Sequence, residues 1–365
     1  MAIRTRAAVL EKKGSPLVIR EIGLEPPGVD EVLVKMEMAG LCRSDLNAVT
    51  GHTRYNMPLV LGHEGAGTVV ETGPGVKNIK SGDRVALSWA AYCGECYFCR
   101  HHQTHLCSSV AWPRGRGFLP DGTTRFCDSS SRDIYHFNGV SSLSEYTVVY
   151  KTGCVAVSRD VPLHVAAATG CSVVTAFGAV FRTAGAAMCK GATAMVVGGG
   201  SVGMAVIEAL RLRGAGRIIL IEQDKKKWKE GLVDYHAASI VPAELARLTD
   251  GVGPDIVFDC VAGKETIARS MEAVRRGGTV VMVGSPHPLM KIELNALDFH
   301  LEKKLIGSLY GSSDPVRDMP KIFDLYGWGL LDLDDSGAQS YGLDDINIAL
   351  MSLKEKGGKF TITFD

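Results

Sequence analysis

The strongest indication of the fold is the stretch Thr193-Ala194-Met195-Val196-Val197-Gly198-Gly199-Gly200-Ser201-Val202-Gly203. Its first five residues are typical of a buried strand, residues 198–203 have the spacing G-x-G-x-x-G, and residues 204–213 have a helical pattern. A glycine loop between a strand and a helix binds the pyrophosphate of a dinucleotide. We therefore expect a nucleotide-binding domain, whose loop contacts the coenzyme through Gly198, Gly200, Ser201, Val202 and Gly203.

The next predicted strand, residues 217–221, is followed by Glu222, which lies 19 residues beyond Gly203. A carboxylate at this place can accept hydrogen bonds from both ribose hydroxyls of NAD and would repel the 2′-phosphate of NADP. The sequence therefore favours NAD. The alternative is a glycine-rich turn followed by an acid that is there by chance.

Strand and helix patterns continue to alternate downstream. Strands are predicted at 255–259, 278–284 and 304–309, and a helix at 265–275. This alternation predicts an α/β fold with a Rossmann doubly wound parallel sheet. In contrast, short β-prone runs at 6–10, 17–20, 31–36 and 144–149 predict a β-rich, barrel-like domain. Residues 108–140 look irregular, and residues 359–364 predict a final strand.

A metal site is predicted by Cys93, Cys96, Cys99 and Cys107, which stand at the spacing C-x2-C-x2-C-x7-C. Thiolates at such spacings converge on one tetrahedral ion, and zinc is the usual ion with four sulfur ligands. Disulfides are the weaker alternative, because the chain is long and shows no secretory leader. Four thiolates leave no open coordination position, so this zinc is expected to be structural.

Composition narrows the class of protein. The chain has 365 residues, of which 46% are hydrophobic and 22% charged, and it contains 40 basic and 40 acidic residues. This length suits two globular domains, and zero net charge gives no reason to expect nucleic acid as a partner. The least charged stretch, 165–181, is short for a membrane span, so no membrane partner is expected. Ten cysteines without a leader indicate a reducing compartment, and we expect the cytoplasm.

Several motifs, taken in order, give the chain a resemblance to the zinc-containing medium-chain alcohol dehydrogenases over nearly its whole length. They are Cys-Arg-Ser-Asp at 42–45, Gly-His-Glu at 62–64, the four cysteines, Gly-Cys at 170–171 and the glycine loop with Glu222. The resemblance implies a GroES-like catalytic domain over 1–172 and 310–365, with a structural zinc lobe at 93–107. It implies a Rossmann NAD-binding domain over 173–309. Segment 108–140 resembles the longer, typically dimeric branch, which implies a homodimer.

By this resemblance, Cys42, His63 and Cys171 bind a second, catalytic zinc. Two thiolates and one imidazole leave a fourth position for water or a substrate oxygen, whose pKa the metal lowers. A hydride then passes from the alcohol carbon to the nicotinamide. Asp45 is expected to fix the tautomer of His63, with a turn or capping role as the alternative. Glu64 matches an acid that the family keeps near the zinc.

A proton relay is implied as well, and here the chain departs from the family. Ser44 matches the hydroxyl that receives the alcohol proton. Asn47 stands where the best-known members have a histidine, and asparagine cannot act as the terminal base. The relay is expected to end either in solvent or at His52, and a solvated histidine with no role is the alternative.

The resemblance also assigns coenzyme contacts outside the glycine loop. Arg43 and Lys359 match basic groups on the pyrophosphate, and Lys227 matches a lysine near the adenosine ribose. Each lysine can instead be a solvated surface charge. The positions that hold the nicotinamide ring are Thr175, Val283, Ser308 and Tyr310.

The same resemblance gives a mostly apolar substrate pocket with aromatic walls. Its expected lining residues are Thr53, Trp89, Phe137, Asn138 and Leu309. Such a pocket favours a small-molecule substrate that is a hydrophobic primary alcohol or aldehyde, aryl or allylic, although Trp89 and Phe137 can also be core residues. The sequence shows no clear cationic group for a glutathione carboxylate, so the glutathione-dependent formaldehyde branch ranks lower.

Two other functions stay open. The first is a non-enzymatic NAD-binding protein on the same fold, which the intact set of Cys42, His63 and Cys171 disfavours. The second is an NAD(P)H-dependent reductase of an activated C=C or iminium bond. Asn47 keeps the second open, because the proton relay is degraded in such relatives.

Overall fold

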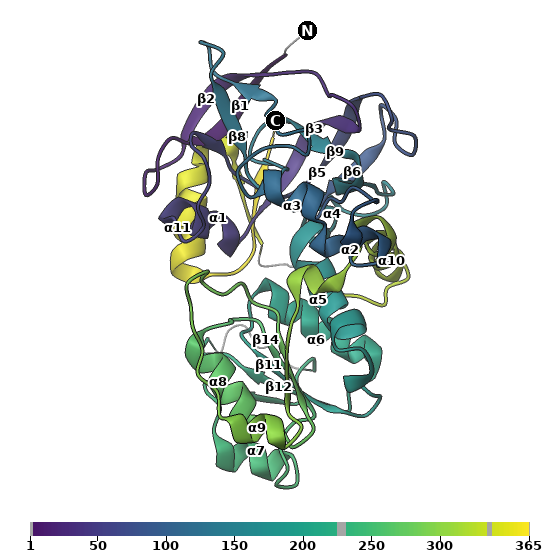
Figure 1. The fold of residues 1–365 in the computed structure, drawn as a ribbon, viewed down its shortest axis with the longest axis vertical. Coiled ribbons are helices and arrows are strands. Elements are labelled where there is room, and N and C mark those ends of the chain that lie inside the picture. The colour runs from purple at the N-terminus through teal and green to yellow at the C-terminus, as the bar shows by residue number, and fades with distance from the viewer. Residues whose placement is uncertain (1–2, 225–230, 334–337, 365) are drawn as a thin grey trace. The chain divides into compact units, whose positions relative to one another are not determined.

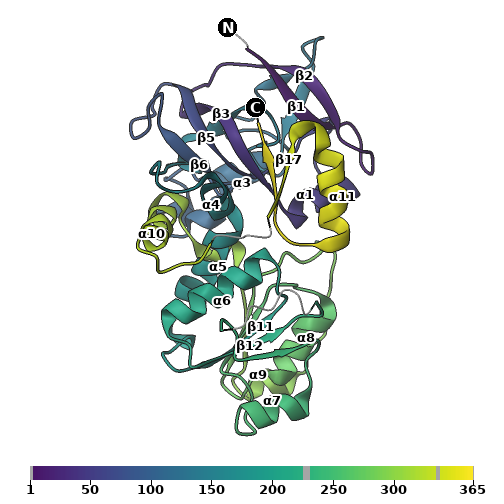
Figure 2. The same cartoon turned by 180° about the vertical axis from the view of Figure 1, so that it is seen from behind.

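The chain folds as two units, as a computed structural model shows for residues 3–224, 231–333 and 338–364 (Figures 1 and 2). The first unit comprises Met1–Cys171 and Asp314–Asp365, and the second comprises Ser172–Ser313. The C-terminal segment therefore returns to the unit that the N-terminal segment builds. Lys227, one of the expected coenzyme contacts, lies outside the described residues.

A closed barrel forms one part of the first unit, with its strands in the order β1, β2, β7, β8 and β4. Side chains of a strand point alternately to opposite faces. Val9 on β1 and Ile22 on β2 are accordingly fully buried in one apolar cluster. The barrel strands are β1 Ile3–Leu10, β2 Val18–Leu24, β4 Leu59–Val60, β7 Phe126–Cys127 and β8 Asp133–His136.

The other part is a seven-stranded sheet in the order β10-β6-β5-β3-β18-β17, with β9 also paired to β3. Strand β18, near the end of the chain, pairs antiparallel with β3, so the C-terminal segment completes the N-terminal sheet. These strands are β3 Glu31–Leu41, β5 Glu64–Thr72, β6 Arg84–Leu87, β9 Tyr146–Tyr150, β10 Cys154–Ala156, β17 Gln339–Gly342 and β18 Phe360–Thr363. The α-helices of this unit are α1 Arg43–Thr50, α2 Tyr97–Arg100, α3 Ser108–Arg114, α4 Leu163–Ala168, α10 Pro315–Gly327 and α11 Ile346–Lys356.

The second unit is built on a six-stranded, all-parallel sheet in the order β13-β12-β11-β14-β15-β16. Helices α6 and α8 lie on opposite sides of strands β11, β12 and β14 in Figures 1 and 2. The predicted doubly wound parallel sheet is therefore confirmed. The strands are β11 Thr193–Val197, β12 Arg217–Ile221, β13 Tyr235–Ala237, β14 Ile256–Asp259, β15 Thr279–Met282 and β16 Lys304–Gly307. The α-helices are α5 Val174–Gly178, α6 Ser201–Arg213, α7 Pro242–Leu248, α8 Lys264–Ala273 and α9 Ala296–His300.

The structure corrects the expectation that residues 108–140 are irregular. They contain helix α3 and the barrel strands β7 and β8. Strand β7 has two residues and β8 has four. Runs of this length show too few residues for an alternation of polar and apolar side chains to be recognised.

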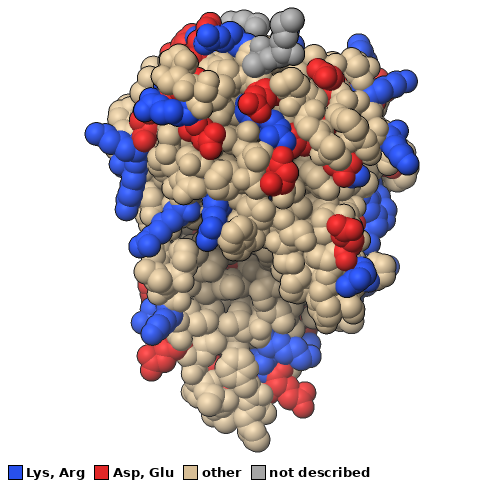
Figure 3. All heavy atoms as spheres, turned by 45° about the horizontal axis from the view of Figure 1, so that its top comes forward, with Lys and Arg blue, Asp and Glu red and all other residues tan. Residues whose placement is uncertain are grey.

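Within the described residues, one helical stretch, Leu163–Thr183, is long and apolar enough to cross a membrane by length and composition. This stretch includes α4 and α5. In the folded chain, 78% of its apolar window is buried. Its apolar character therefore reflects a helix in the protein core. On the face in Figure 3, Lys and Arg are mixed with Asp and Glu, so no extended field of one sign forms there.

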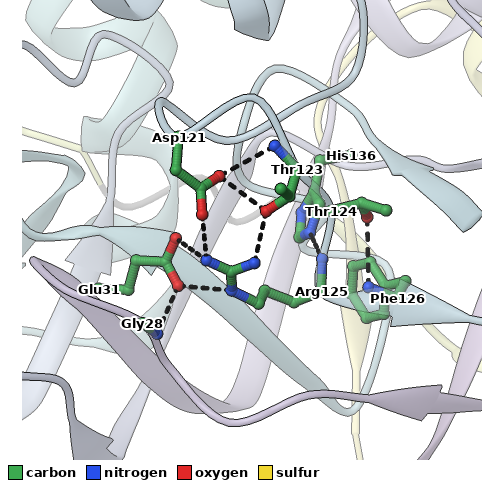
Figure 4. Close-up of polar contacts among 8 residues, drawn as sticks. All are labelled: Gly28, Glu31, Asp121, Thr123, Thr124, Arg125, Phe126 and His136. Carbon is green, nitrogen blue, oxygen red and sulfur yellow. Dashed lines mark hydrogen bonds and ion pairs between the residues drawn. The ribbon is translucent and has the colours of Figure 1, made fainter.

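A buried ion pair ties the segment before β7 to strand β3 (Figure 4). The Nε and Nη2 atoms of Arg125 donate to the two carboxylate oxygens of Glu31, at 2.8 and 2.9 Å. Glu31 also accepts a hydrogen bond from the backbone N–H of Gly28, and Arg125 pairs in addition with Asp121. Because Glu31 is only 1% exposed, Arg125 supplies the positive charge that makes this burial tolerable.

His136 continues this network toward residues 137 and 138, which are expected to line the substrate pocket. Its Nε2 atom accepts a hydrogen bond from the backbone N–H of Arg125, at 3.3 Å. Burial, and then the Arg125 charge, lower the pKa of His136 to about 3, so the ring is neutral in the folded chain. His136 directly precedes Phe137 and Asn138, two of the expected pocket residues. The network therefore fixes the start of that segment.

We expect Arg125→Met to destabilise the first unit by about 3 kcal/mol, because it leaves the Glu31 carboxylate buried without its partner. Calorimetric melting would show a transition several degrees lower. The matched control is Arg132→Met, which removes a guanidinium that is 79% exposed and pairs with Asp128. That change should cost less than about 1 kcal/mol, and equal losses in the two variants would contradict the role given to burial.

Candidate functional site

The four predicted cysteine ligands converge in one lobe of the first unit. Cys96 directly precedes α2, which carries Cys99, and Cys107 directly precedes α3. The Sγ···Sγ distances are 3.6 Å for Cys96–Cys99 and Cys93–Cys107, and 3.9 Å for Cys93–Cys99 and Cys96–Cys107. Tetrahedral zinc with Zn–S bonds of about 2.3 Å requires sulfurs roughly 3.8 Å apart. The lobe therefore fits a four-sulfur zinc site.

Backbone amides of the lobe prepare the sulfurs for a cation. The N–H groups of Glu95 and Cys96 point to the Sγ of Cys93, and the N–H of Cys93 points to the Sγ of Cys107. Although burial opposes ionisation, hydrogen bonds from the backbone of Cys99 and Ser108 help to lower the pKa of Cys96 to about 5. Thiolates are the ligand form, so the surroundings of Cys96 favour metal binding, whereas burial raises the pKa of Cys99 and Cys107.

A second cluster of donor atoms forms from distant parts of the same unit. One ligand atom from each of Cys42, His63, Glu64 and Cys171 lies within 4.8 Å of the others. Cys42 stands at the start of α1, His63 and Glu64 at the start of β5, and Cys171 just after α4. The family resemblance implied that these four residues lie together, and the fold brings them together.

Asp45 holds two of these segments in register. Its Oδ2 accepts the backbone N–H of Cys42 at 3.0 Å and thereby caps α1. Its Oδ1 accepts the backbone N–H of Gly62 at 3.1 Å and lies 3.3 Å from Nδ1 of His63. Asp45 therefore combines the expected contact to His63 with the capping role that the sequence left as the alternative. A carboxylate at Nδ1 keeps the proton there and leaves Nε2 as the free donor atom.

The cluster fits a metal ion with sulfur and nitrogen ligands. Nε2 of His63 is buried and has no nitrogen or oxygen partner among the described residues, which is costly unless a ligand satisfies it. The side chain interacts instead with Cys42, another member of the cluster. The Cys171 thiol donates to Cys42, which lowers the pKa of Cys42 well below its ordinary value despite burial. The same contact, together with burial, raises the pKa of Cys171. A proton shared between two thiols is what a divalent cation displaces on binding.

Glu64 differs from the other three residues of the cluster. Burial, and then the Cys42 thiolate, raise the pKa of Glu64 to about 8. Its place is set by strand pairing with Gly40, where a Cβ atom would come 2.4 Å from the Glu64 carboxylate. Cys171 is set by a similar approach, because a Cβ on Gly170 would lie 1.9 Å from the carbonyl oxygen of Leu87. Close backbone packing thus delivers both side chains to the cluster.

The residues of the expected proton relay lie along α1 and the loop that follows it. The Sγ of Cys42 and the Oγ of Ser44 are 3.9 Å apart, so the serine hydroxyl borders the cluster. Asn47 is half-buried in α1. His52 is exposed beyond the end of α1, with its Nδ1 atom 2.7 Å from the Oγ1 of Thr50.

Four of the five expected pocket residues belong to the first unit. The ring of Phe137 is buried and meets the His63 ring edge-on, with centroids 5.5 Å apart. Trp89 follows β6 and is half-buried, and Oγ1 of Thr53 is buried with no hydrogen-bond partner in the part of the chain that the structure describes. Asn138 adopts a positive φ of 53°. Leu309 belongs to the second unit, where its side chain is 48% exposed.

Tyr55 packs against two of the expected pocket residues, which the sequence did not reveal. Its ring meets the Phe137 ring edge-on, at a centroid distance of 5.1 Å, and its hydroxyl donates to Oδ1 of Asn138 at 2.9 Å. Burial raises the pKa of Tyr55 to about 12. The only sequence signal was an aromatic residue in the loop after α1, which does not say what the ring packs against.

The glycine loop of the second unit fits a dinucleotide phosphate. A Cβ on Gly203 would lie 1.8 Å from the carbonyl oxygen of Gly198, so helix α6 can pack this closely on the loop only with glycine there. Gly200 caps α6, and a Cβ added to it would meet no described atom within 4 Å. The N-terminus of a thirteen-residue helix is thereby left open to an anion.

The other expected coenzyme residues of this unit follow the ends of parallel strands or lie in α5. Glu222 follows β12, and its Oε2 accepts the backbone N–H of Gly199 at 2.7 Å, so its carboxylate lies against the glycine loop. Val283 follows β15 and Ser308 follows β16, which places them at the same sheet edge as the loop. Thr175 in α5 and Tyr310 beyond β16 are buried. Arg43, at the start of α1, and Lys359, just before β18, belong to the first unit.

Family comparisons agree with both units. Residues 28–159 match the family model described as alcohol dehydrogenase GroES-like domain, and residues 201–326 match the model described as zinc-binding dehydrogenase. These matches confirm the predicted combination of a GroES-like domain with a Rossmann-like coenzyme domain.

Individual relatives cover nearly the whole chain. Alcohol dehydrogenase class-3 of Cereibacter sphaeroides is 35% identical, over 94% of this chain and 95% of that protein. S-(hydroxymethyl)glutathione dehydrogenase of Saccharomyces cerevisiae is also 35% identical, over 96% and 94%. Among solved structures, benzyl alcohol dehydrogenase from Acinetobacter calcoaceticus covers 100% of both chains, with a TM-score of 0.92 and 26% identity.

Metal analysis of the purified protein should give two zinc ions per chain. We expect Cys42→Ser to lose one zinc and Cys96→Ser to lose the other, because each change removes a ligand from one cluster. Cys189→Ser is the matched control, since Cys189 is exposed and belongs to neither cluster. Two zincs retained in Cys42→Ser would refute the second site.

Proposed function

Because this chain belongs to the zinc-containing medium-chain alcohol dehydrogenases, oxidoreductases that act on CH–OH groups, we propose that it transfers a hydride reversibly between NAD and a hydrophobic primary alcohol, aryl or allylic. The observation that carries the proposal is the cluster of Cys42, His63 and Cys171 with aromatic side chains against it. When bound there, zinc would polarise the substrate oxygen and lower the pKa of the alcohol. The nicotinamide would accept the hydride.

The surroundings of the cluster support an apolar substrate. Phe137 packs on the His63 ring, and Tyr55 packs on Phe137. Rings in this position would exclude water and favour an aryl or allylic group over a polar one. The structural likeness to a benzyl alcohol dehydrogenase, at 26% identity over the whole chain, points the same way.

For the proton, we propose that Ser44 receives it from the alcohol and passes it to solvent or to His52. Ser44 borders the cluster, and Asn47 has no titratable group. The exposed position of His52 beyond α1 suits either a terminal acceptor or a solvated side chain. A cytoplasmic homodimer completes the proposal, on the strength of the cysteine usage and of segment 108–140.

A second candidate substrate is S-(hydroxymethyl)glutathione. The names of relatives at 34 to 35% identity favour it. It requires a cation for the glutathione carboxylates. Arg114 is the positive group beside Trp89, and its Nη1 already donates to the Trp89 carbonyl oxygen at 2.8 Å. We therefore rank this substrate second.

With NAD, we expect benzyl and cinnamyl alcohols to be oxidised with a kcat/KM about tenfold or more above that of ethanol. Burial of an aryl or allylic group contributes about 1.5–3 kcal/mol, which an ethyl group cannot supply. NADH absorbance measures each rate. A faster reaction with formaldehyde plus glutathione would favour the second candidate. Reduction of an activated alkene or iminium, without alcohol oxidation, would favour the reductase function instead.

We expect Glu222→Ala to raise KM for NAD about tenfold or more, because it removes a charged hydrogen-bond acceptor, and to improve the use of NADP. Asp224→Asn is the matched control, since it removes a negative charge two residues away. The backbone N–H of Asp224, which this change keeps, donates to Glu222. Steady-state kinetics with both coenzymes test this. If the two variants relax the preference equally, general charge and not Glu222 sets it.

A further inference from the structure

Trp89 does more than line a pocket. Its indole N–H, the only polar group of the side chain, forms a hydrogen bond to Cys171. Cys171 is a member of the metal-ligand cluster, so this N–H points to a sulfur that would bind zinc. An N–H directed at a thiolate withdraws electron density from the sulfur and weakens its donation to a metal.

Two independent contacts hold Trp89 against Cys171. The backbone at Gly170 packs on the carbonyl oxygen of Leu87, the last residue of β6, which leaves room for no side chain. Trp89 follows two residues after Leu87, and Cys171 follows directly after Gly170. The tight backbone contact therefore brings the two side chains to one place, whatever the indole orientation.

Arg114 fixes the orientation of the indole. Its Nη1 donates to the Trp89 carbonyl oxygen at 2.8 Å, and its Cζ lies 5.0 Å from the centroid of the Trp89 ring. The hydrogen bond holds the backbone of Trp89, and the cation–π contact holds its ring. Among the described residues no carboxylate forms an ion pair with Arg114, and burial lowers the pKa of its guanidinium. Arg114 therefore contacts Trp89 at two points, and its charge also interacts with Tyr55 and Cys107.

Arg114 also leads back to the four-cysteine lobe. It is the last residue of α3, which begins directly after the ligand Cys107. Seven helical residues span about 10 Å, and Figures 1 and 2 place α3 close to β6 and α4. A continuous series of contacts thus runs from Cys107 through α3, Arg114 and Trp89 to Cys171.

We propose that Trp89 is a positioning residue for the metal ligand Cys171, that Arg114 holds it in place, and that the pair couples the four-cysteine lobe to the second metal centre. The inference rests on the metal site of the proposed function. It gives the indole N–H a role, the hydrogen bond to Cys171, that lining a pocket does not require. A wall requires the ring only, whereas the bond to sulfur requires the nitrogen.

Trp89→Phe keeps an aromatic ring and removes the N–H. In protein whose second site is loaded with Co²⁺, we expect the sulfur-to-cobalt charge-transfer band to move to lower energy, because the sulfur becomes the better donor. We also expect affinity for the metal, measured by competition with a chelator, to change by about tenfold or more. Arg114→Met should produce a smaller change in the same direction, and Arg114→Lys should restore it only in part, because lysine lacks the planar fork.

The same helix offers a matched control. Arg116 lies over the ring of Trp112, 4.1 Å from its centroid, and Trp112 is 65% exposed. Trp112→Phe and Arg116→Met disrupt an arginine–tryptophan pair of the same kind and should leave the spectrum and the metal affinity unchanged. An unchanged spectrum in Trp89→Phe would overturn the proposal. Failure of the wild-type protein to bind metal at Cys171 would instead overturn the proposed function.

Discussion

The buried carboxylate of Asp45 is the constraint on which the metal cluster depends. A charge withdrawn from water is costly unless donors surround it. Asp45 meets this requirement with the backbone N–H groups of Cys42 and Gly62 and with the ring of His63. Because these donors come from the start of α1 and the start of β5, satisfying one carboxylate fixes two members of the cluster, Cys42 and His63, at once. The cluster is thus arranged by hydrogen bonding within the protein before any cation is considered.

Close packing of the backbone positions the third residue of the cluster, Cys171. Cys171 lies 108 residues beyond His63 in the chain, and its approach depends on Gly170 lying against Leu87. The chain end contributes too, because β18 pairs with β3 next to the segment that leads into Cys42. In the second unit, the contact of Gly203 with the Gly198 carbonyl has the same character. In both units, glycine lets two backbones approach closely, and the functional groups stand beside that contact.

These two kinds of constraint explain what the sequence could and could not predict. The four-cysteine lobe and the glycine loop are local patterns with fixed spacing, so they were visible, and strands β11 and β12 were predicted with the bounds they have. Strands β7 and β8 are too short to show a period. The packing of Tyr55 on Phe137 and the pairing of Arg125 with Glu31 join residues that are 82 and 94 positions apart. No local pattern announces such pairs, because each partner looks like an ordinary aromatic or charged residue.

The aromatic residues around the cluster also limit how the substrate range can change. Phe137 packs on the ring of His63, and Trp89 donates its N–H to Cys171, and both partners belong to the cluster. A side chain that is expected to line the substrate pocket is thus in contact with a group that would hold the metal. Exchanging either ring for a smaller residue would open space for substrate and at the same time loosen a ligand. Tyr55 packs on Phe137 and donates to Asn138, neither of which belongs to the cluster. Variation at Tyr55 would therefore alter the surroundings of the cluster at the least cost to the residues that would hold the metal.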